Sequence, residues 1–193
     1  NKENFKQLDK ILQFSKNLPN IKLSLANSGG IMLGSKFCLD QTRPGIGLFG
    51  IDNFGNNIEL NSRTLKLPLS LHGPVIQLRD VDIGEKVSYG GVDITKRKSK
   101  LATIGIGYAD GWLRLLKPNS SFVIMKKKCK IIGNVTMDSF VLDVTDLKEK
   151  LLKEGDYLCL LDNTNIKNIV TKLDIISYEL LTIMGNRLLR KYN

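Results

Sequence analysis

The stretch IKLSLANSGGIMLGSKF, residues 21–37, joins two apolar segments through a turn that contains two adjacent glycines. Residues 21–26 have the length and apolar content of a short buried strand, and residues 31–37 those of a short helix. On either side, residues 3–17 place apolar side chains at helical spacing, and residues 45–50 form a second short apolar run, which we interpret as a strand. This order of helix, strand, helix and strand predicts parallel strands joined by crossover helices.

Two such strands do not complete a sheet, so we expect residues 1–55 to be the end of a larger α/β domain. After residue 64 the pattern changes to short apolar runs separated by glycine, aspartate, asparagine and proline, which is the spacing of an antiparallel sheet or barrel. We expect these strands at residues 74–79, 87–89, 102–106, 122–125, 130–135, 140–144 and 157–161. Helices are expected at residues 147–153, 165–173 and 177–189, the last with Ser177 as its N-cap. The predicted organisation is an α/β fragment (1–55), a linker (56–64) and a mainly antiparallel β domain with C-terminal helices (65–193).

The composition is that of a folded protein, with 42% hydrophobic and 25% charged residues. No run of about 18 apolar residues is present, so we expect no membrane span. Three scattered cysteines, Cys38, Cys129 and Cys159, lack the spacing of metal ligands and favour a reducing, cytoplasmic setting. Asp143 and Asp146 have no histidine or third acid at ligand spacing, so we predict no metal site.

The net charge of +10 raises the question of a nucleic-acid partner. However, 22 of the 29 basic residues are lysines spread along the chain, and only residues 126–130 form a dense cluster. Charge runs are usually solvated, so we interpret this cluster as a solvated hairpin and predict no nucleic-acid partner. A basic β-barrel that binds nucleic acid is the alternative.

Ser28 stands where the first predicted strand meets glycines and the start of a helix. Such a turn offers a hydroxyl and free backbone amides to a phosphate, although spacing alone favours the simpler interpretation that Ser28 is the helix N-cap. The amides of Gly45 and Ile46 could add to the same phosphate site. Arg43 precedes Pro44 at the entrance of the second strand, where it forms either a surface salt bridge or a contact with a ligand.

Tyr108 follows the apolar strand at residues 102–106 and precedes a tight Ala-Asp-Gly-Trp turn. The turn would present the phenol at a domain edge, and a half-buried tyrosine packed at a strand end is the alternative. A free tyrosine phenol has a pKa of about 10, so a tyrosine that acts as a base needs nearby cations. We expect Asp110, Trp112 and Arg114 to shape the loop around Tyr108.

Taken in order, residues 27–30, 42–47, 107–112 and 177–179 resemble the motifs of the fold-type III alanine racemases, enzymes that use pyridoxal 5'-phosphate (PLP). The resemblance extends from about residue 20 to the last residue. It implies that residues 1–55 are the last strands and helices of a (β/α)8 barrel. It also implies that the barrel segment with the PLP-binding lysine is missing from this chain.

The resemblance assigns the phosphate of PLP to Ser28, to the amides of Gly45 and Ile46, and to the phenol of Tyr178. It implies that Arg43 hydrogen-bonds the pyridine nitrogen. Arginine stays protonated at any working pH, so it donates to that nitrogen instead of protonating it.

The resemblance also implies that Tyr108 is one of two bases that exchange the α-proton of the amino acid, the PLP lysine being the other. Met137 and Asp138 would line the end of the site that receives the substrate carboxylate. These residues and Tyr108 would reach the PLP of a partner subunit, so a homodimer with shared sites is expected. The implied activity is the interconversion of L-alanine and D-alanine for peptidoglycan synthesis.

Three hypotheses follow for the chain. In the first, it is part of a racemase and is inactive unless a lysine-bearing N-terminal part completes it. In the second, it is a non-catalytic relic of a split or decaying racemase gene, although the intact set of motif residues argues against long decay. In the third, it is the basic nucleic-acid-binding module.

Overall fold

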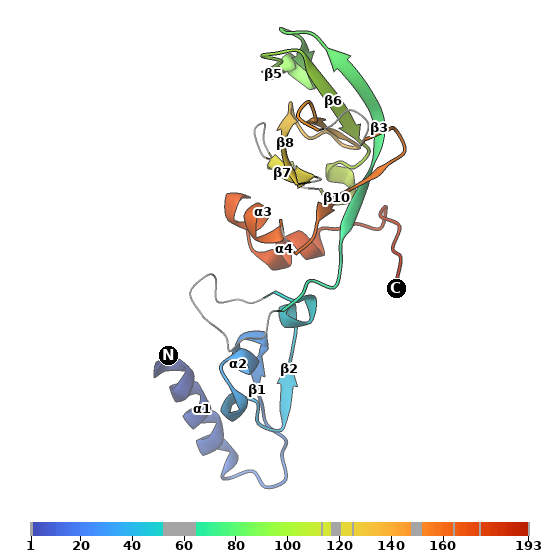
Figure 1. Cartoon of the computed structure of the whole chain (residues 1–193). Helices are drawn as coiled ribbons and strands as arrows, with labels where there is room; N and C mark the ends of the chain where they lie inside the picture. Colours follow the sequence, from blue (N-terminus) through green and yellow to red (C-terminus); the bar gives the residue numbers. More distant parts are fainter. Residues whose placement is uncertain are drawn as a thin grey trace. The chain divides into compact units, whose positions relative to one another are not determined.

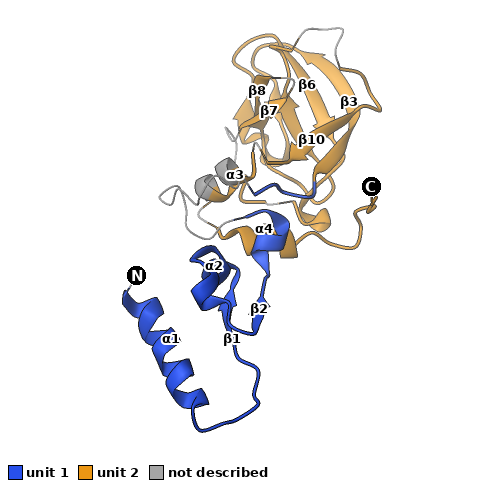
Figure 2. Cartoon of the chain, turned by 60° about the horizontal axis from the view of Figure 1, so that its bottom comes forward, with its two compact units in different colours: residues 1–69 blue, residues 70–193 orange. Residues whose placement is uncertain are grey.

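The computed structural model describes residues 2–51, 65–112, 114–116, 121–124, 126–147, 152–163, 165–173 and 175–192. The chain divides into two compact units, unit 1 (residues 1–69) and unit 2 (residues 70–193), which Figure 2 colours separately. The predicted linker at residues 56–64 and most of the predicted helix at residues 147–153 lie outside the described residues.

In its described residues, unit 1 contains two short parallel strands and two α-helices (Figure 1). Helix α1 (Lys2–Ser15) is followed by β1 (Ser24–Asn27), α2 (Ser28–Met32) and β2 (Gln41–Arg43). Strands β1 and β2 pair in parallel, which confirms the predicted parallel pairing, although the second strand lies at residues 41–43 and not at residues 45–50. The small core of the unit consists of buried Leu8, Ala26 and Phe37, with partly buried Ile11, Leu25, Ile31, Leu33 and Leu39 packed against them.

The second apolar run, residues 45–50, is not the strand that we predicted. Strand β2 ends at Arg43, and Ile46–Phe49 form a 3-10 turn. Pro44 has no N–H to give to a strand ladder, and the chain turns there because the amides of Gly45 and Gly47 donate to a side chain of the neighbouring segment. The apolar run therefore turns back over the end of the sheet.

Unit 2 is built on a six-stranded antiparallel sheet with the order β10-β3-β6-β9-β8-β7. Strand β10 also contacts β7, so the sheet curls into a nearly closed barrel (Figure 1). The mainly antiparallel β domain is confirmed. Its strands are β3 (Leu71–Val81), β6 (Ser99–Ile104), β7 (Ser121–Ile124), β8 (Lys127–Ile132), β9 (Phe140–Asp143) and β10 (Tyr157–Leu161), with a separate pair, β4 (Lys86–Val87) and β5 (Asp93–Ile94).

An aromatic cluster fills part of the interior of unit 2. The ring of Trp112 lies 5.6 Å from that of Phe122 and 5.9 Å from that of Phe140, centroid to centroid. All three side chains are buried, with Trp112 only 2% exposed, so Trp112 serves packing. Trp112 closely follows the turn that carries Tyr108, so its packing in this cluster anchors the end of that turn.

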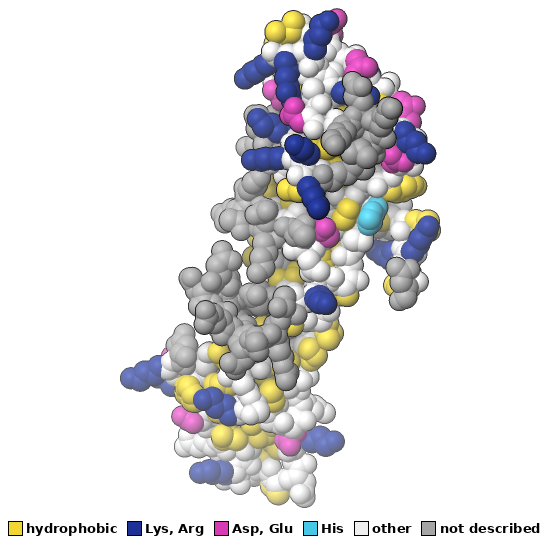
Figure 3. All heavy atoms as spheres, viewed as in Figure 1, with side chains coloured by type: hydrophobic (Ala, Val, Ile, Leu, Met, Phe, Trp, Pro, Cys, Tyr) yellow, Lys and Arg dark blue, Asp and Glu magenta, His cyan; other side chains and the backbone are white. Residues whose placement is uncertain are grey.

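The basic cluster at residues 126–130 forms part of the β7–β8 hairpin, as predicted. Along β8 the side chains alternate, with Cys129 and Ile131 buried and Lys128 and Lys130 exposed. Figure 3 shows lysine and arginine side chains spread over the visible face with acidic side chains among them. The lysines of this cluster are therefore exposed to solvent on the outer face of a hairpin.

The C-terminal helices are α3 (Ile166–Leu173) and α4 (Ser177–Thr182). Helix α4 is shorter than the predicted 177–189, and its N-cap is Ile176, so the assignment of Ser177 as N-cap was wrong. The helix stops where the following backbone meets another segment: the amide of Gly185 donates to the carbonyl of Asp110. A long-range hydrogen bond thus replaces the helical continuation that local sequence favoured.

Burial makes Cys129 an unreactive thiol. Burial raises its pKa to about 11, and the negative charges of Asp143 and Asp146 act in the same direction. Because the thiolate is the reactive form, we expect iodoacetamide at pH 8 to label Cys129 much more slowly than the half-buried Cys38 in the native chain. Peptide mass spectrometry over a labelling time course checks this, with the urea-unfolded chain as the control in which all cysteines react alike. Equal native rates would contradict the burial of Cys129.

Candidate functional site

Ser28 lies at the junction of β1 and α2, at the carboxyl end of the two parallel strands. It is not the N-cap: the side chain of Asn27 caps α2 by accepting a hydrogen bond from the amide of Gly30 (3.0 Å). Ser28 is buried, and its Oγ accepts hydrogen bonds from the amides of Gly45 (2.8 Å) and Gly47 (3.0 Å). The Ser28 hydroxyl therefore holds the loop that follows β2 close to the start of α2 through these two hydrogen bonds.

Between Gly45 and Gly47, the loop after β2 has one backbone amide that is not used in this way, that of Ile46. In the described residues the amide of Ile46 donates to no acceptor, while its side chain is buried and holds the backbone in place. A Cβ added at Gly47 would lie 3.3 Å from the Ser28 Oγ, a tight contact that would require the hydroxyl or the loop to shift slightly. Gly47 was missed from the sequence, and the Gly45-Ile46-Gly47 repeat is the signal that could have identified it.

Arg43 ends β2 opposite Asn27, directly beside the Ser28 junction. Its Nη1 donates to the carbonyl oxygen (2.9 Å) and hydroxyl (2.8 Å) of Ser24, and its Nη2 donates to the carbonyl of Leu25 (3.2 Å). Among the residues that the structure describes it forms no ion pair, so the salt-bridge interpretation is not supported. These bonds occupy three of the five guanidinium N–H groups, and two N–H groups remain.

Tyr108 begins the 3-10 turn Tyr108–Asp110 that follows β6. Its side chain is 46% exposed. Its amide donates to the carbonyl of Thr136 (3.0 Å), and the amide of Ala109 donates to the carbonyl of Met137 (3.0 Å). The structure therefore brings Tyr108 beside the Met137 and Asp138 segment, a proximity that nothing in the local sequence required.

Asp110 and Arg187 stabilise the contact between the Tyr108–Asp110 turn and the segment that contains Asp138. Asp110 is buried, and its carboxylate accepts from the amide of Gly107 (2.9 Å) and pairs with Nε of Arg187 (3.2 Å). Arg187 also donates from Nη2 to the carboxylate of Asp138 (2.7 Å), and this bond, with the charge of Asp110, raises the pKa of the Arg187 guanidinium. The sequence carried no signal for Arg187, which lies beyond the last motif.

Tyr178 lies in the first turn of α4, with its side chain 41% exposed and its carbonyl accepting a hydrogen bond from the hydroxyl of Thr182. It belongs to unit 2, whereas Ser28 and Arg43 belong to unit 1. A contact between the Tyr178 phenol and the phosphate therefore stays a prediction.

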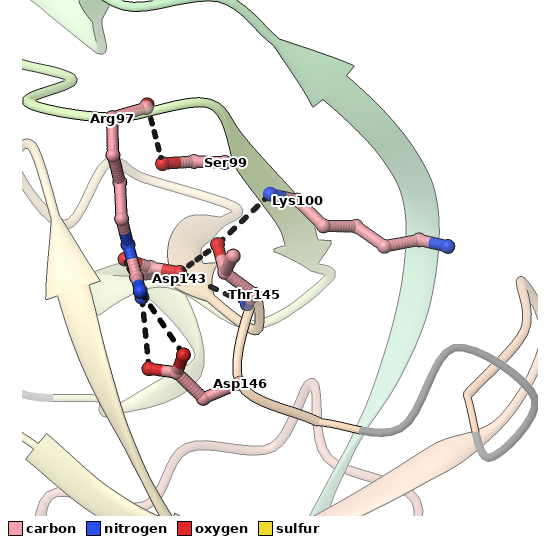
Figure 4. A network of polar contacts seen from close by, with 6 residues as sticks. All are labelled: Arg97, Ser99, Lys100, Asp143, Thr145 and Asp146. Atoms are coloured by element: carbon pink, nitrogen blue, oxygen red, sulfur yellow. Dashed lines mark hydrogen bonds and ion pairs between the residues drawn. The ribbon is translucent and has the colours of Figure 1, made fainter.

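The aspartate pair that could suggest a metal is an ion-pair network (Figure 4). The guanidinium of Arg97 donates to both carboxylate oxygens of Asp146 (3.0 and 2.8 Å) and lies 3.6 Å from the carboxylate of Asp143. The hydrogen bond with Arg97 lowers the pKa of the Asp146 carboxyl. Within the described ranges no cluster of three or more histidine, cysteine, aspartate or glutamate side chains could hold a metal ion, and no helix is long and apolar enough to cross a membrane.

Comparison with known proteins gives a consistent result along the chain. The family model for the alanine racemase C-terminal domain matches residues 68–192, and that for the alanine racemase N-terminal domain matches residues 1–53. The alanine racemase of Brucella canis is 40% identical over 202 aligned residues, which cover 100% of this chain and 51% of that protein. The alanine racemase of Rickettsia bellii is 35% identical and is covered over 46% of its length.

Solved structures show the same likeness. The crystal structure of alanine racemase from Bartonella henselae with covalently bound pyridoxal phosphate superposes with a TM-score of 0.87 at 39% identity, covering 100% of this chain and 53% of that one. The Clostridium difficile alanine racemase complex with cycloserine gives a TM-score of 0.85 at 26% identity, covering 97% of this chain and 51% of that one. The chain spans about half the length of the relatives that it matches. From the match to both domain models and the identity to relatives along its whole length, the chain belongs to the alanine racemase family.

Proposed function

We propose that this chain is the C-terminal part of a PLP-dependent alanine racemase that interconverts L-alanine and D-alanine and so supplies D-alanine for peptidoglycan. The observation that carries the proposal is the junction of Ser28 with the Gly45–Gly47 loop at the carboxyl ends of two parallel strands, where β2 ends at Arg43. This is where open α/β sheets and (β/α)8 barrels bind their ligands.

The residues of unit 1 fit PLP. The Ser28 hydroxyl and the amide of Ile46 would hold its phosphate together with the Tyr178 phenol, since hydroxyls and backbone amides are good partners for a phosphate. The amide of Gly45 would join them by exchanging its hydrogen bond to the Ser28 hydroxyl for one to the phosphate. PLP, when bound, withdraws electrons from the α-carbon of the amino acid and makes its proton acidic. Arg43 would donate one of its two remaining N–H groups to the ring nitrogen without protonating it, which moderates that electron withdrawal and favours return of the proton over transamination.

The residues of unit 2 would carry out the proton transfer. Tyr108 removes or returns the α-proton on one face of the amino acid, with a lysine from an N-terminal barrel part acting on the other face. Met137 and Asp138 line the end of the site that takes the substrate carboxylate. We propose that Tyr108, Met137 and Asp138 serve the site of a partner subunit in a C₂ homodimer, which closes with two equivalent sites.

A chimera tests the proposed function. The part of the Brucella canis alanine racemase that lies N-terminal to the matched region is fused ahead of this chain, because the two sequences are 40% identical over the rest. We expect the 193-residue chain with PLP to racemise no alanine, and the chimera to racemise it in both directions.

The outcomes separate the hypotheses. Racemisation and stoichiometric PLP absorbance from the chain alone would overturn the need for a lysine-bearing segment. A folded chimera that binds PLP without racemising alanine would favour the non-catalytic relic. A salt-dependent mobility shift with oligonucleotides would favour the nucleic-acid module, and its absence at low salt would exclude that module.

A further inference from the structure

Among the described residues of unit 2, Arg97 and Arg187 each bind two aspartates, but only Arg187 does so beside Tyr108. Arg187 joins Asp110, in the turn that carries Tyr108, to Asp138, in the segment after β8 (3.2 and 2.7 Å). Arg187 itself comes from the segment after α4. Three chain segments that are distant in sequence are therefore tied together by one planar guanidinium.

The buried carboxylate of Asp110 depends on this guanidinium. Asp110 is only 8% exposed, and a carboxylate removed from water is costly unless it is paired and hydrogen-bonded. Arg187 supplies the opposite charge, and the amide of Gly107 supplies a hydrogen bond to the second oxygen (2.9 Å). Without Arg187 the carboxylate would have to turn toward water and release the amide of Gly107.

Movement of Asp110 would move Tyr108, because the two residues belong to one short turn. The turn is held at Gly107 by the Asp110 carboxylate and at its other end by the amide of Gly185, which donates to the carbonyl of Asp110 (3.2 Å). The amide of Tyr108 is bound to the carbonyl of Thr136 (3.0 Å). These contacts fix the backbone that carries the phenol, and two of them are made by Asp110, which pairs with Arg187.

We infer that Arg187 is a positioning residue for proton transfer: it locks the Tyr108 turn onto the segment that contains Met137 and Asp138. The inference rests on the proposed role of Tyr108 as a base. Arg187 acts through Asp110 and Asp138. A misplacement of about 1 Å at a reacting group can cost about 10²-fold in rate, so loss of the lock should lower kcat more than it raises KM.

The fork shape of arginine matters here. Arg187 uses Nε for one carboxylate and Nη2 for the other, and a lysine ammonium at the end of a flexible stem cannot present two donors in that fixed geometry. We therefore expect Arg187→Lys to keep the charge and recover only part of the activity that Arg187→Gln loses.

Arg97 provides the matched control. Its side chain is 51% exposed and that of Arg187 is 52% exposed, and each pairs with two aspartates. Figure 4 shows the Arg97 network, which contains none of the residues around Tyr108. A general effect of removing a surface arginine should be the same at both positions, whereas a positioning effect should occur only at Arg187.

The experiment measures kcat and KM for alanine in the chimera for Arg187→Gln, Arg187→Lys and Arg97→Gln, and records the ¹⁹F NMR spectrum of the 193-residue chain labelled with 3-fluorotyrosine. The Tyr108 resonance is assigned from its loss in Tyr108→Phe. We expect Arg187→Gln to lower kcat about 10²-fold, with KM changed less than about threefold, and to shift the Tyr108 resonance. We expect Arg97→Gln to change neither.

Equal kcat in Arg187→Gln and Arg97→Gln, or an unmoved Tyr108 resonance in Arg187→Gln, would overturn the inference. If the unsubstituted chimera is inactive, the proposed function fails, and the NMR arm still decides whether Arg187 sets the position of Tyr108. Thermal unfolding of each variant identifies a loss of activity that comes from loss of the fold.

Discussion

Replacing Tyr108 with phenylalanine should lower kcat for alanine racemisation in the chimera by about 10²- to 10⁴-fold, the range that a positioned general acid or base contributes. The substitution removes one hydroxyl and keeps the ring, and the turn is held by backbone bonds to Thr136 and Met137, so the fold should persist. The loss then reports the proton that the phenol removes or returns.

The two-base arrangement gives this variant a sharper signature. If Tyr108 serves one face of the amino acid and a lysine serves the other, Tyr108→Phe should still exchange the α-proton of one enantiomer with deuterium from solvent, without inversion. The other enantiomer should exchange very slowly. Proton NMR of L-alanine and D-alanine incubated separately in D₂O measures both rates.

Tyr89→Phe is the control for this experiment. Tyr89 lies in unit 2, is 81% exposed and belongs to a different 3-10 turn, Tyr89–Gly91. It should retain full activity. Equal exchange of both enantiomers in Tyr108→Phe, or a kcat within a few-fold of the unsubstituted enzyme, would remove Tyr108 from the chemistry.

Replacing Gly107 with alanine should damage both the fold and the site. A Cβ at this position would overlap the backbone carbonyls of Met137 and Thr136, which are the groups that bind the Tyr108 turn. Backbone cannot move aside as a flexible side chain can, so the two segments must separate. We expect a loss of about 1–3 kcal/mol in the free energy of unfolding, typical of overpacking, and a fall in kcat of at least about 10²-fold.

Gly185→Ala is the matched control for Gly107→Ala. Gly185 donates its amide to the carbonyl of Asp110, and an added Cβ there would meet the nearest atom, the carbonyl oxygen of Ala109, at 3.8 Å, an ordinary contact. It should change the free energy of unfolding by less than about 0.5 kcal/mol. Urea unfolding of the chain and kcat of the chimera compare the two variants. Equal results for both would show that the close approach at Gly107 does not matter.

The errors of prediction in unit 1 have one physical cause. The run at residues 45–50 has strand-like composition, and Ser28 stands where an N-cap is common, so local propensity favoured both wrong assignments. The same interaction overrode both preferences. The amides of Gly45 and Gly47 donate to the Ser28 hydroxyl, so they do not extend a strand, and the hydroxyl does not cap helix α2. The residues that misled local reasoning are those of the proposed phosphate site.

In unit 2 the strands were easier to predict than the helix ends. Strand β10 has the predicted bounds, and residues 102–106 and 140–144 overlap β6 and β9, because each of these strands carries apolar side chains that are buried in the unit. Strand β8 begins earlier than predicted, since its lysines hide the apolar alternation of Cys129 and Ile131. Helix α4 stops short of the predicted end, and the amide of Gly185, just beyond the helix, donates to the distant carbonyl of Asp110.

The sequence by itself determined the order of elements, the parallel pairing in unit 1, the antiparallel sheet of unit 2 and the motif residues. These follow from side chains two to four positions apart, whose spacing decides which face of a helix or strand is apolar. Only the tertiary structure decided what the polar groups bind. Ser28 meets amides 17 and 19 residues away, and Arg187 meets Asp138 49 residues away. A hydrogen bond requires its atoms to lie within about 3 Å, and the spacing of residues along the chain does not specify which distant atoms the fold brings that close.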